Sequence, residues 1–312
     1  MLKVENLVKK YGNATALAGV SFSVAKGEVV GFLGPNGAGK STTMNIVTGY
    51  LSSNVGKVYV DGIEILENPT EAKKKIGYLP EQPPLYMEMT VDEYLNFVYE
   101  LRKCTLPRAE HLAEICEVVK ISDVRGRVIR NLSKGYKQRV GIASALVGNP
   151  PLIILDEPTI GLDPKQIIEV RNLIRTLGRD HTVILSTHIL SEAQAVCDRM
   201  IIIDHGRIVA DGKTEEINQF IQDNRRYKAL ICGPQNEVLA LLRTLPGVVA
   251  CDTLAEREGD AVAFAIEAKS GIDIRKALFY ALAEKHWPLM GLEAIGMSLE
   301  DIFIKLVDKE DA

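Results

Sequence analysis

The sequence predicts an α/β fold with a largely parallel sheet, followed by a smaller α+β domain. Short apolar runs bounded by Gly or Pro alternate with longer amphipathic stretches, as they do in repeated βα units. A different order of strands and helices follows after residue 225. Four of the first runs are hydrophobic almost throughout, as expected of strands covered on both faces: Val29–Leu33, Leu152–Leu155, Thr182–Ser186 and Met200–Asp204.

The segments between these strands predict two further parts of the first domain. Leu2–Lys9 and Val20–Val24, with Lys57–Val60, are typical of antiparallel strands. Between Val91 and Val119 the apolar residues recur at helical spacing. We therefore expect an antiparallel β subdomain and a helical subdomain at about residues 84–147.

The C-terminal part predicts a small ferredoxin-like domain. Its elements follow the order β-α-β-β-α-β, with one helix-like segment before them, Glu215–Gln222, and one after, Leu299–Val307. The resulting domains are residues 1–222 and 225–312. The expected strands are Arg226–Cys232, Gly247–Thr253, Ala261–Glu267 and Pro288–Ala294, and the expected helices are Asn236–Thr244 and Ile272–Lys285.

Bulk properties exclude several classes of protein. A chain of 312 residues fits two domains, because single cores stop growing at roughly 250–300 residues. The net charge of −4 gives no reason to expect nucleic-acid binding. The five cysteines include no Cys-x-x-Cys pair, which argues against a zinc site or a disulfide framework and favours a reducing compartment. We find no signal segment and no apolar run near the roughly 20 residues that span a bilayer, so we expect a soluble chain.

A glycine-rich motif follows the first buried strand. Glycine permits the tight turn in which backbone N–H groups point at phosphate oxygens, and the next helix adds the positive end of its dipole. Lys40 would neutralise the β- and γ-phosphates and the Ser41 hydroxyl would bind Mg²⁺, so we expect a nucleoside triphosphate and Mg²⁺ as ligands. By itself the motif leaves kinases, GTPases and many ATPases open. The motif is Gly34-Pro35-Asn36-Gly37-Ala38-Gly39-Lys40-Ser41-Thr42.

Two adjacent carboxylates end the strand Leu152–Leu155. Burying Asp156 and Glu157 is costly unless a metal ion and a water molecule use them. Side chains alternate along a strand, so the two carboxylates point in different directions. Asp156 suits the surroundings of Mg²⁺, and Glu157 suits the polarisation of an attacking water.

With their motifs in this order along the chain, residues 1–220 resemble the nucleotide-binding subunit of an ABC (ATP-binding cassette) transporter. The resemblance implies that Tyr11 stacks on adenine, that Gln82 senses Mg²⁺ and the membrane partner, and that His188 is a switch histidine. Gly161-Leu162-Asp163-Pro164 resembles the loop that carries an aspartate between subunits. Asn131-Leu132-Ser133-Lys134-Gly135-Tyr136-Lys137-Gln138-Arg139 resembles the family signature Leu-Ser-Gly-Gly-Gln.

The signature departs from the family pattern at two positions. Lys134 replaces a glycine and Tyr136 replaces the glutamine, while Ser133 and Gly135, which reach the γ-phosphate in the family, are retained. Lys134 adds a cation near that phosphate, and Tyr136 removes an amide donor. This variant resembles the branch that serves separate ABC-2-type membrane proteins, which includes gliding-associated and multidrug-export-like ATPases.

The resemblance implies a mechanism and a set of partners. Two subunits pack head to tail with two ATP molecules between them, and hydrolysis opens the dimer. With all catalytic positions present, we expect a homodimer, although a heterodimer is an alternative. The chain would power a separate transmembrane permease, an exporter by its branch, from the cytoplasmic face of the membrane, and Val91–Val119 would dock on that permease. For residues 225–312 we expect a stabilising or dimer-extending appendage, with ligand sensing as the alternative.

Two other classes of protein compete with this interpretation. A soluble ABC ATPase acting on ribosomes or DNA would carry tandem cassettes, insertions or a basic surface, and this chain has none of them. A phosphotransferase would leave the Leu132–Gly135 signature without a task. Detection of a phosphorylated acceptor, rather than free phosphate alone, would favour that second alternative.

Overall fold

The computed structural model describes residues 1–217, 226–269 and 271–295 of the chain. Within it the chain divides into two compact units, Met1–Thr214 and Glu215–Ala312. The domain boundary predicted between residues 222 and 225 lies outside the described residues, as do the predicted helix Leu299–Val307 and the end of the predicted helix Glu215–Gln222.

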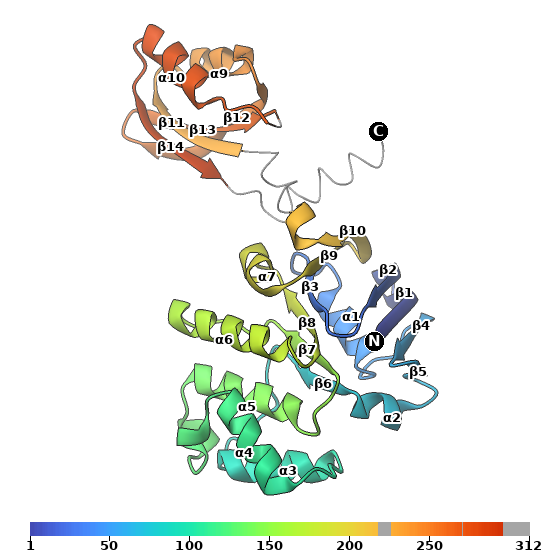
Figure 1. Ribbon diagram of the computed structural model, residues 1–312. Helices are drawn as coiled ribbons and strands as arrows, with labels where there is room; N and C mark the ends of the chain where they lie inside the picture. Colours follow the sequence, from blue (N-terminus) through green and yellow to red (C-terminus); the bar gives the residue numbers. More distant parts are fainter. Residues whose placement is uncertain (218–225, 270, 296–312) are drawn as a thin grey trace. The chain divides into compact units, whose positions relative to one another are not determined.

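A six-stranded sheet forms the centre of the first unit, with the order β10-β9-β3-β8-β7-β6 (Figure 1). The five strands from β9 to β6 run parallel to their neighbours, and β10 is antiparallel to β9 at the edge. All four predicted buried strands are present within a residue of their predicted ends; β6 and β10 were not predicted. The bounds are β3 Val29–Leu33, β6 Ile76–Leu79, β7 Leu152–Asp156, β8 Thr182–Thr187, β9 Arg199–Asp204 and β10 Arg207–Lys213.

Helices follow the parallel strands and bury one face each. Helix α1 (Lys40–Val47) starts directly beyond the glycine-rich loop, and α6 (Pro164–Leu177) and α7 (Leu190–Val196) follow β7 and β8. The short α2 (Pro69–Lys74) precedes β6. Because both faces of β3 and β7 are covered, all their side chains are buried, and Phe32 and Ile154 lie in the main hydrophobic core.

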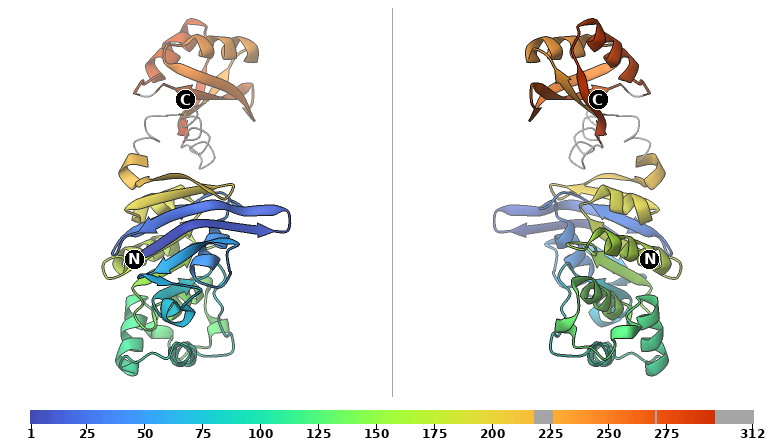
Figure 2. Two further views of the ribbon diagram at one scale, coloured as in Figure 1. Left: turned by 90° about the vertical axis from the view of Figure 1, so that its right-hand side faces the viewer. Right: turned by 90° about the vertical axis from the view of Figure 1, so that its left-hand side faces the viewer.

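An antiparallel sheet with the order β2-β1-β4-β5 forms the second layer of this unit (Figure 2). Strand β2 starts at Ala14, earlier than the predicted Val20, because it pairs with β1 along its whole length. Gly12 permits the hairpin turn between them at a φ of 58°. The bounds are β1 Leu2–Tyr11, β2 Ala14–Val24, β4 Val55–Val60 and β5 Ile63–Glu64.

The predicted helical subdomain consists of α3 (Val91–Leu101), α4 (Arg108–Val118) and α5 (Lys134–Leu146), with short 3₁₀ turns at Ser122–Val124 and Ile129–Asn131. Thr90 begins α3 with a reciprocal capping box: its side chain accepts the Glu93 N–H, and the Glu93 carboxylate accepts the Thr90 N–H. None of the helices in the described ranges is long and apolar enough to cross a membrane.

The second unit contains a four-stranded antiparallel sheet with the order β12-β13-β11-β14, and its elements follow one another as predicted. Strand β12 extends past the predicted Thr253 because it forms a hairpin with β13. Helix α10 begins at Arg275, not Ile272, because the Asp273 carboxylate accepts the Arg275 N–H and makes a turn first. The bounds are β11 Arg226–Cys232, α9 Gln235–Thr244, β12 Val248–Glu258, β13 Ala261–Ala268, α10 Arg275–Glu284 and β14 Leu289–Ile295.

Candidate active site

The glycine-rich loop between β3 and α1 is shaped by two glycines that no other residue could replace without displacing the backbone. A Cβ on Gly34 would lie 2.3 Å from the Ile203 carbonyl oxygen. Gly39 has a φ of 110°, and a Cβ there would lie 2.8 Å from Leu17 Cδ2. The loop therefore wraps closely over β9 and delivers the N-terminus of α1 to the carboxyl ends of the parallel strands, where ligands bind in open α/β sheets.

A pocket of about 350 Å³ opens at this point. It gathers residues from the ends of β3, β6, β7 and β8, which are far apart in the sequence. Eight of its eleven lining residues were predicted as site residues, and Ala16, Glu81 and Ile160 were not. The lining residues are Ala16, Asn36, Gly37, Gly39, Lys40, Ser41, Thr42, Glu81, Glu157, Ile160 and His188.

Lys40 supplies the positive charge of the pocket. Its side chain is only 6% exposed, and its ammonium donates hydrogen bonds to the carbonyl oxygens of Gly34 at 2.7 Å and Pro35 at 3.2 Å. Burial lowers the pKa of Lys40, and the carboxylates of Glu157 and Asp156 oppose that shift. An ammonium held in this way attracts phosphate oxygens strongly, because little water competes for it.

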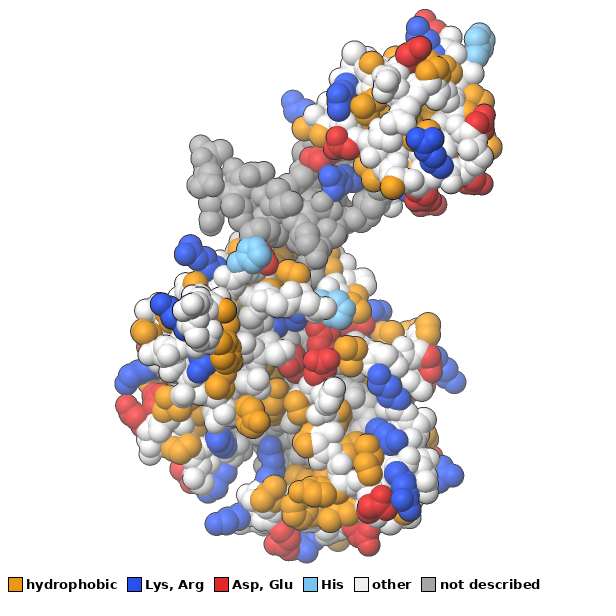
Figure 3. All heavy atoms as spheres, turned by 180° about the vertical axis from the view of Figure 1, so that it is seen from behind, with side chains coloured by type: hydrophobic (Ala, Val, Ile, Leu, Met, Phe, Trp, Pro, Cys, Tyr) orange, Lys and Arg blue, Asp and Glu red, His pale blue; other side chains and the backbone are white. Residues whose placement is uncertain are grey.

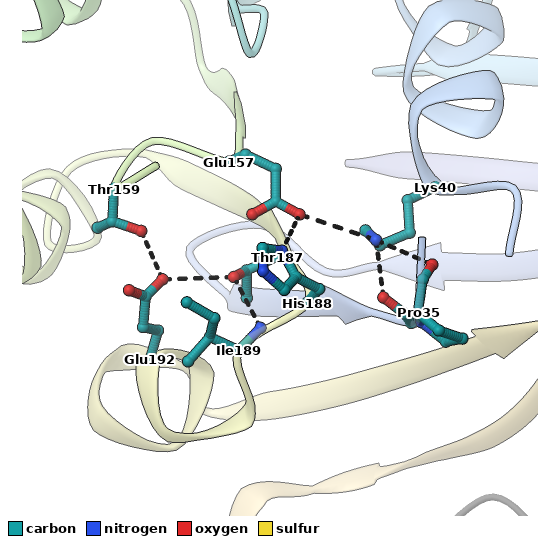
Figure 4. Close-up of polar contacts among 9 residues, drawn as sticks. Pro35, Lys40, Glu157, Thr159, Thr187, His188, Ile189 and Glu192 are labelled. Atoms are coloured by element: carbon teal, nitrogen blue, oxygen red, sulfur yellow. Dashed lines mark hydrogen bonds and ion pairs between the residues drawn. The ribbon is translucent and has the colours of Figure 1, made fainter. Parts of the chain in front are cut away.

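Glu157 points into the same pocket, as predicted from its place after β7 (Figure 4). Its φ of 48° turns the backbone out of the strand direction, and its N–H donates to the Ser186 carbonyl at 2.9 Å. Its Oε1 lies 2.9 Å from Nδ1 of His188 and 3.7 Å from Nζ of Lys40. A buried carboxylate between an imidazole and an ammonium is well placed to orient and polarise a water molecule beside a bound phosphate.

Asp156 has a different environment, as the alternation along β7 predicts. It is 2% exposed, does not line the pocket, and its Oδ1 has no hydrogen-bond partner in the described parts of the chain. Burial raises the pKa of Asp156, with the charges of Glu157 and Glu81 acting in the same direction, while the nearby hydroxyls of Ser186 and Ser41 oppose the rise. A buried carboxylate oxygen without a partner, beside the Ser41 hydroxyl, fits the oxygen ligand set that Mg²⁺ prefers.

Two predicted residues lie on the surface. Gln82 is exposed and does not line the pocket, whereas its neighbour Glu81 does. Tyr11 is 52% exposed at the end of β1, with the Lys9 ammonium 5.4 Å from the centre of its ring. The pairing of β6 with β7 explains the position of Glu81, because Leu79 lies beside Leu155 and the next residues reach the pocket beside Glu157.

The predicted signature residues form a separate cluster and do not line the pocket. Ser133 caps α5 by accepting the Tyr136 N–H at 3.4 Å, and Asp163 caps α6 by accepting the Gln166 N–H at 2.9 Å. The two helix starts touch, because a Cβ on Gly135 would lie 2.7 Å from the Gln166 side chain. The Tyr136 hydroxyl donates to Asp123 at 2.9 Å, outside the pocket.

Three buried residues beside the pocket carry no signal in the sequence that we recognised. Thr187 is the last residue of β8, Thr159 follows the end of β7 by three residues, and Glu192 is the third residue of α7. Threonine and glutamate are mostly exposed in proteins, so the residue type alone predicts a surface position for each of the three. Only the spatial neighbourhood of Glu157 and His188 distinguishes them (Figure 4).

The fold and this site define a P-loop ATPase of the transporter-associated class, and comparisons with known proteins agree. Residues 17–160 match the family model of the ABC transporter. The linearmycin resistance ATP-binding protein LnrL of Bacillus subtilis (strain 168) is 32% identical over 317 residues, which cover 99% of each protein. The bacitracin transport ATP-binding protein BcrA of Bacillus licheniformis is 30% identical over 319 residues, covering 98% of this chain and 97% of BcrA.

Among solved structures, the ATP-binding cassette MJ0796 in a dimeric post-hydrolysis state with ADP and Pi is 29% identical and has a TM-score of 0.62. The alignment covers 69% of this chain and 99% of MJ0796. The chain therefore belongs to the ABC transporter family, as an ATP-binding subunit that hydrolyses ATP to power transport. This confirms the resemblance to the nucleotide-binding subunit of an ABC transporter.

Proposed function

We propose that this chain is the ATPase subunit of an ABC exporter and that it acts with a separate membrane permease. Support comes from relatives named for linearmycin resistance and bacitracin transport, which align along almost their whole length. No helix in the described residues is long and apolar enough to cross a membrane, and we assign the transport path to a separate membrane protein. We place the subunit at the cytoplasmic face of the membrane, bound through that permease.

The arrangement of Glu157, His188 and Lys40 in one pocket is the single observation that carries the catalytic proposal. Lys40 and the N–H groups of the loop from Gly34 to Thr42 hold the β- and γ-phosphates. Glu157 acts as general base toward the attacking water, and His188 orients Glu157 and contacts the γ-phosphate. Tyr11 provides the surface on which adenine stacks.

For Mg²⁺ we propose Ser41 and Asp156 as protein ligands, directly or through water. When bound, Mg²⁺ neutralises charge on the phosphates. We place the third protein ligand of Mg²⁺ in the segment after β6. The family resemblance assigns Gln82, whereas the position of Glu81 in the pocket makes its carboxylate a second candidate. A carboxylate is a better ligand for a hard cation than an amide oxygen is.

We propose a head-to-tail dimer in which Ser133, Gly135 and Asp163 of one subunit complete the pocket of the other. These residues present a helix N-terminus, an anion site, yet do not line the pocket of their own chain. A dimeric state with ADP and Pi is described for MJ0796. Because every pocket residue that catalysis requires is present, we favour a homodimer over a heterodimer with a degenerate partner.

The permease docks on the helical subdomain, beside the segment that follows Gln82. Tyr86, Met87, Phe97 and Leu101 are all exposed there, and Tyr86 and Phe97 pack edge to face with ring centroids 5.2 Å apart. Figure 3 shows hydrophobic side chains gathered at the lower end of the first unit, where α3 lies in Figure 1. Exposed apolar patches of this kind mark sites of protein association.

We infer that the second unit is a ferredoxin-like domain, because its strand order and antiparallel pairing fit the β-α-β-β-α-β pattern. It has a hydrophobic core of its own, with side chains such as Phe264, Leu278 and Val238, as expected of a domain that folds independently. We propose that it stabilises or extends the dimer.

The test of the catalytic proposal is Glu157→Gln. Glutamine retains the size of the side chain and can still contact His188, but it cannot accept a proton. We expect steady-state release of phosphate from ATP to fall by roughly 10²–10⁴-fold, the range for a positioned general base, with nucleotide binding retained. Near-normal phosphate release by this variant would remove Glu157 from the role of base.

A further inference from the structure

Glu192 is a buried carboxylate that no sequence motif assigns to catalysis. It lies on α7 and is 2% exposed. Among the described residues its hydrogen-bond partners are two threonine hydroxyls, and it forms no ion pair with a basic side chain. A leucine would fill this position at a lower desolvation cost, so the charge and its hydrogen bonds need another explanation.

The two partners of Glu192 belong to different segments (Figure 4). Thr159 Oγ1 donates to Glu192 Oε2 at 2.6 Å, and Thr187 Oγ1 donates to the same oxygen at 3.3 Å. Both threonines are buried, with 5% and 0% exposure. One carboxylate oxygen therefore joins the chain beyond β7 to the end of β8.

These two threonines are the neighbours of the reacting groups. Thr187 directly precedes His188, and its hydroxyl also accepts the Ile189 N–H at 3.1 Å. Because a hydroxyl has a single proton, Thr187 gives that proton to Glu192 while it accepts from Ile189. The backbone on both sides of His188 is fixed by this pair of bonds.

Thr159 lies two residues after Glu157 and four before Asp163. Its carbonyl accepts the Leu162 N–H at 3.1 Å, and the Glu157 carbonyl accepts the Ile160 N–H at 3.2 Å. The turn from Glu157 to Asp163 is thus held internally and is attached to Glu192 through the Thr159 hydroxyl. Glu157 and His188 are then linked twice, directly at 2.9 Å and through Thr159, Glu192 and Thr187.

We propose that Glu192 is a positioning residue that couples the Gly161–Pro164 loop to His188. A displacement of that loop is transmitted through Thr159, Glu192 and Thr187 to the setting of His188 against Glu157. The coupling rests on the proposed function, in which this loop lies between two subunits. It gives the chain a route by which assembly of the dimer sets the geometry of hydrolysis.

The first test compares Thr187→Val, which removes the hydroxyl, with Thr187→Ser, which retains it. We expect Thr187→Val to lower kcat by about tenfold or more with the KM for ATP changed less than about twofold, the pattern of an interaction used only in the transition state. Thr187→Ser should stay within about twofold of the unaltered chain in both quantities. Equal activity of the two variants would overturn the proposal.

The second test asks whether Glu192 acts through His188. In single-turnover hydrolysis we expect Glu192→Leu to lower the rate about tenfold or more by itself, and less than about twofold when added to His188→Ala. A residue with a merely structural role would lower the rate by the same factor in both backgrounds, and that result would overturn the proposal. If Glu192→Leu does not fold, Thr187→Val takes its place in the same cycle.

A third measurement does not depend on hydrolysis. The ring signals of His188, identified by their loss in His188→Ala, are followed by NMR in the nucleotide-free chain. We expect Thr159→Val to shift them and Thr159→Ser to leave them in place, although Thr159 does not contact His188. Unshifted signals in Thr159→Val would overturn the coupling. Failure of the proposed function would instead show as normal phosphate release by Glu157→Gln, whatever the spectra show.

Discussion

At the scale of single residues, Glu157 shows how a backbone angle sets the chemistry of a side chain. Its φ of 48° lies in the left-handed region, which costs a residue with a Cβ about 1–3 kcal/mol, and Pro158 follows it. This turn brings Glu157 to Lys40 and His188, while Asp156 stays buried in the strand. The rest of the fold must hold the angle, because the local sequence does not favour it.

Glu81 and Gln82 lead to a prediction at the same scale. Because Glu81 lines the pocket and Gln82 does not, we expect Glu81→Ala to raise the Mg²⁺ concentration needed for tight ATP binding by about tenfold or more, the range for groups that support a metal. Gln82→Ala is the matched control and should have a smaller effect. The measurement is a titration of Mg²⁺ with a fluorescent ATP analogue. A larger effect of Gln82→Ala would support the assignment from family resemblance.

At the scale of elements, α5 and α6 show how helix starts build a composite surface. Each helix is capped by a side chain at its N-terminus, Ser133 and Asp163, and the two starts meet where Gly135 accommodates Gln166. A larger residue in place of Gly135 would displace the Gln166 side chain from this contact. In the proposed dimer, the free N–H groups that remain at the start of α5 face the nucleotide bound to the other subunit.

Helix α4 carries a pH-dependent contact with the end of α5. His111 is buried, and its Nε2 accepts the Gly148 N–H at 2.9 Å, which requires a neutral ring. Burial lowers the pKa of His111, with Glu114 opposing. The unfolded chain therefore takes up a proton at a higher pH than the folded chain does, so this group contributes stability above its ordinary pKa of about 6.5, which is lost as pH falls below it.

We expect the free energy of unfolding to fall more steeply between about pH 7.5 and 5.5 in the unaltered chain than in His111→Leu, which cannot titrate. At pH 7.5 the variant should already be less stable by about 1–3 kcal/mol, because the Gly148 N–H loses its partner. Urea denaturation followed by circular dichroism at both pH values measures the two effects. Parallel pH slopes would show that His111 does not titrate between the two states.

At the scale of the whole molecule, the first unit contains a pocket with phosphate-binding, basic and acidic groups, but its signature residues lie outside that pocket. In the proposed head-to-tail dimer, the signature residues of one chain complete the pocket of the other. The alignment with MJ0796 covers 69% of this chain. The alignments with LnrL and BcrA cover nearly the whole length of this chain.

We expect Glu157→Gln to shift from monomer to dimer when Mg-ATP is added, because the bound γ-phosphate is not removed. Light scattering after gel filtration measures the mass. Lys40→Ala in the same background is the control. Because it lacks the ammonium that attracts the phosphates, it should bind nucleotide weakly and remain monomeric. Absence of a shift with nucleotide bound would mean that a permease or another cassette is needed, or that the head-to-tail arrangement is wrong.

The sequence alone predicted the α/β core, the antiparallel and helical parts, the order of elements in the second unit, and eight residues that line the pocket. These features depend on periodicity and on local motifs, which a linear chain carries completely. Strands β5, β6 and β10 were missed, because β5 and β6 have only 2 and 4 residues, and the apolar run in the 7 residues of β10 is interrupted by Asp211 and Gly212.

Only the tertiary structure decided that Glu81 reaches the pocket and that Thr159, Glu192 and Thr187 join the base to the histidine. The pairing of parallel strands determines both results, because it brings the ends of β6, β7 and β8 together although about 30 or more residues of chain separate each from the next. Residue types reveal a chemistry when they form a motif. A carboxylate and two hydroxyls scattered along a chain acquire a role only when the fold buries them together, so that they hydrogen-bond to one another.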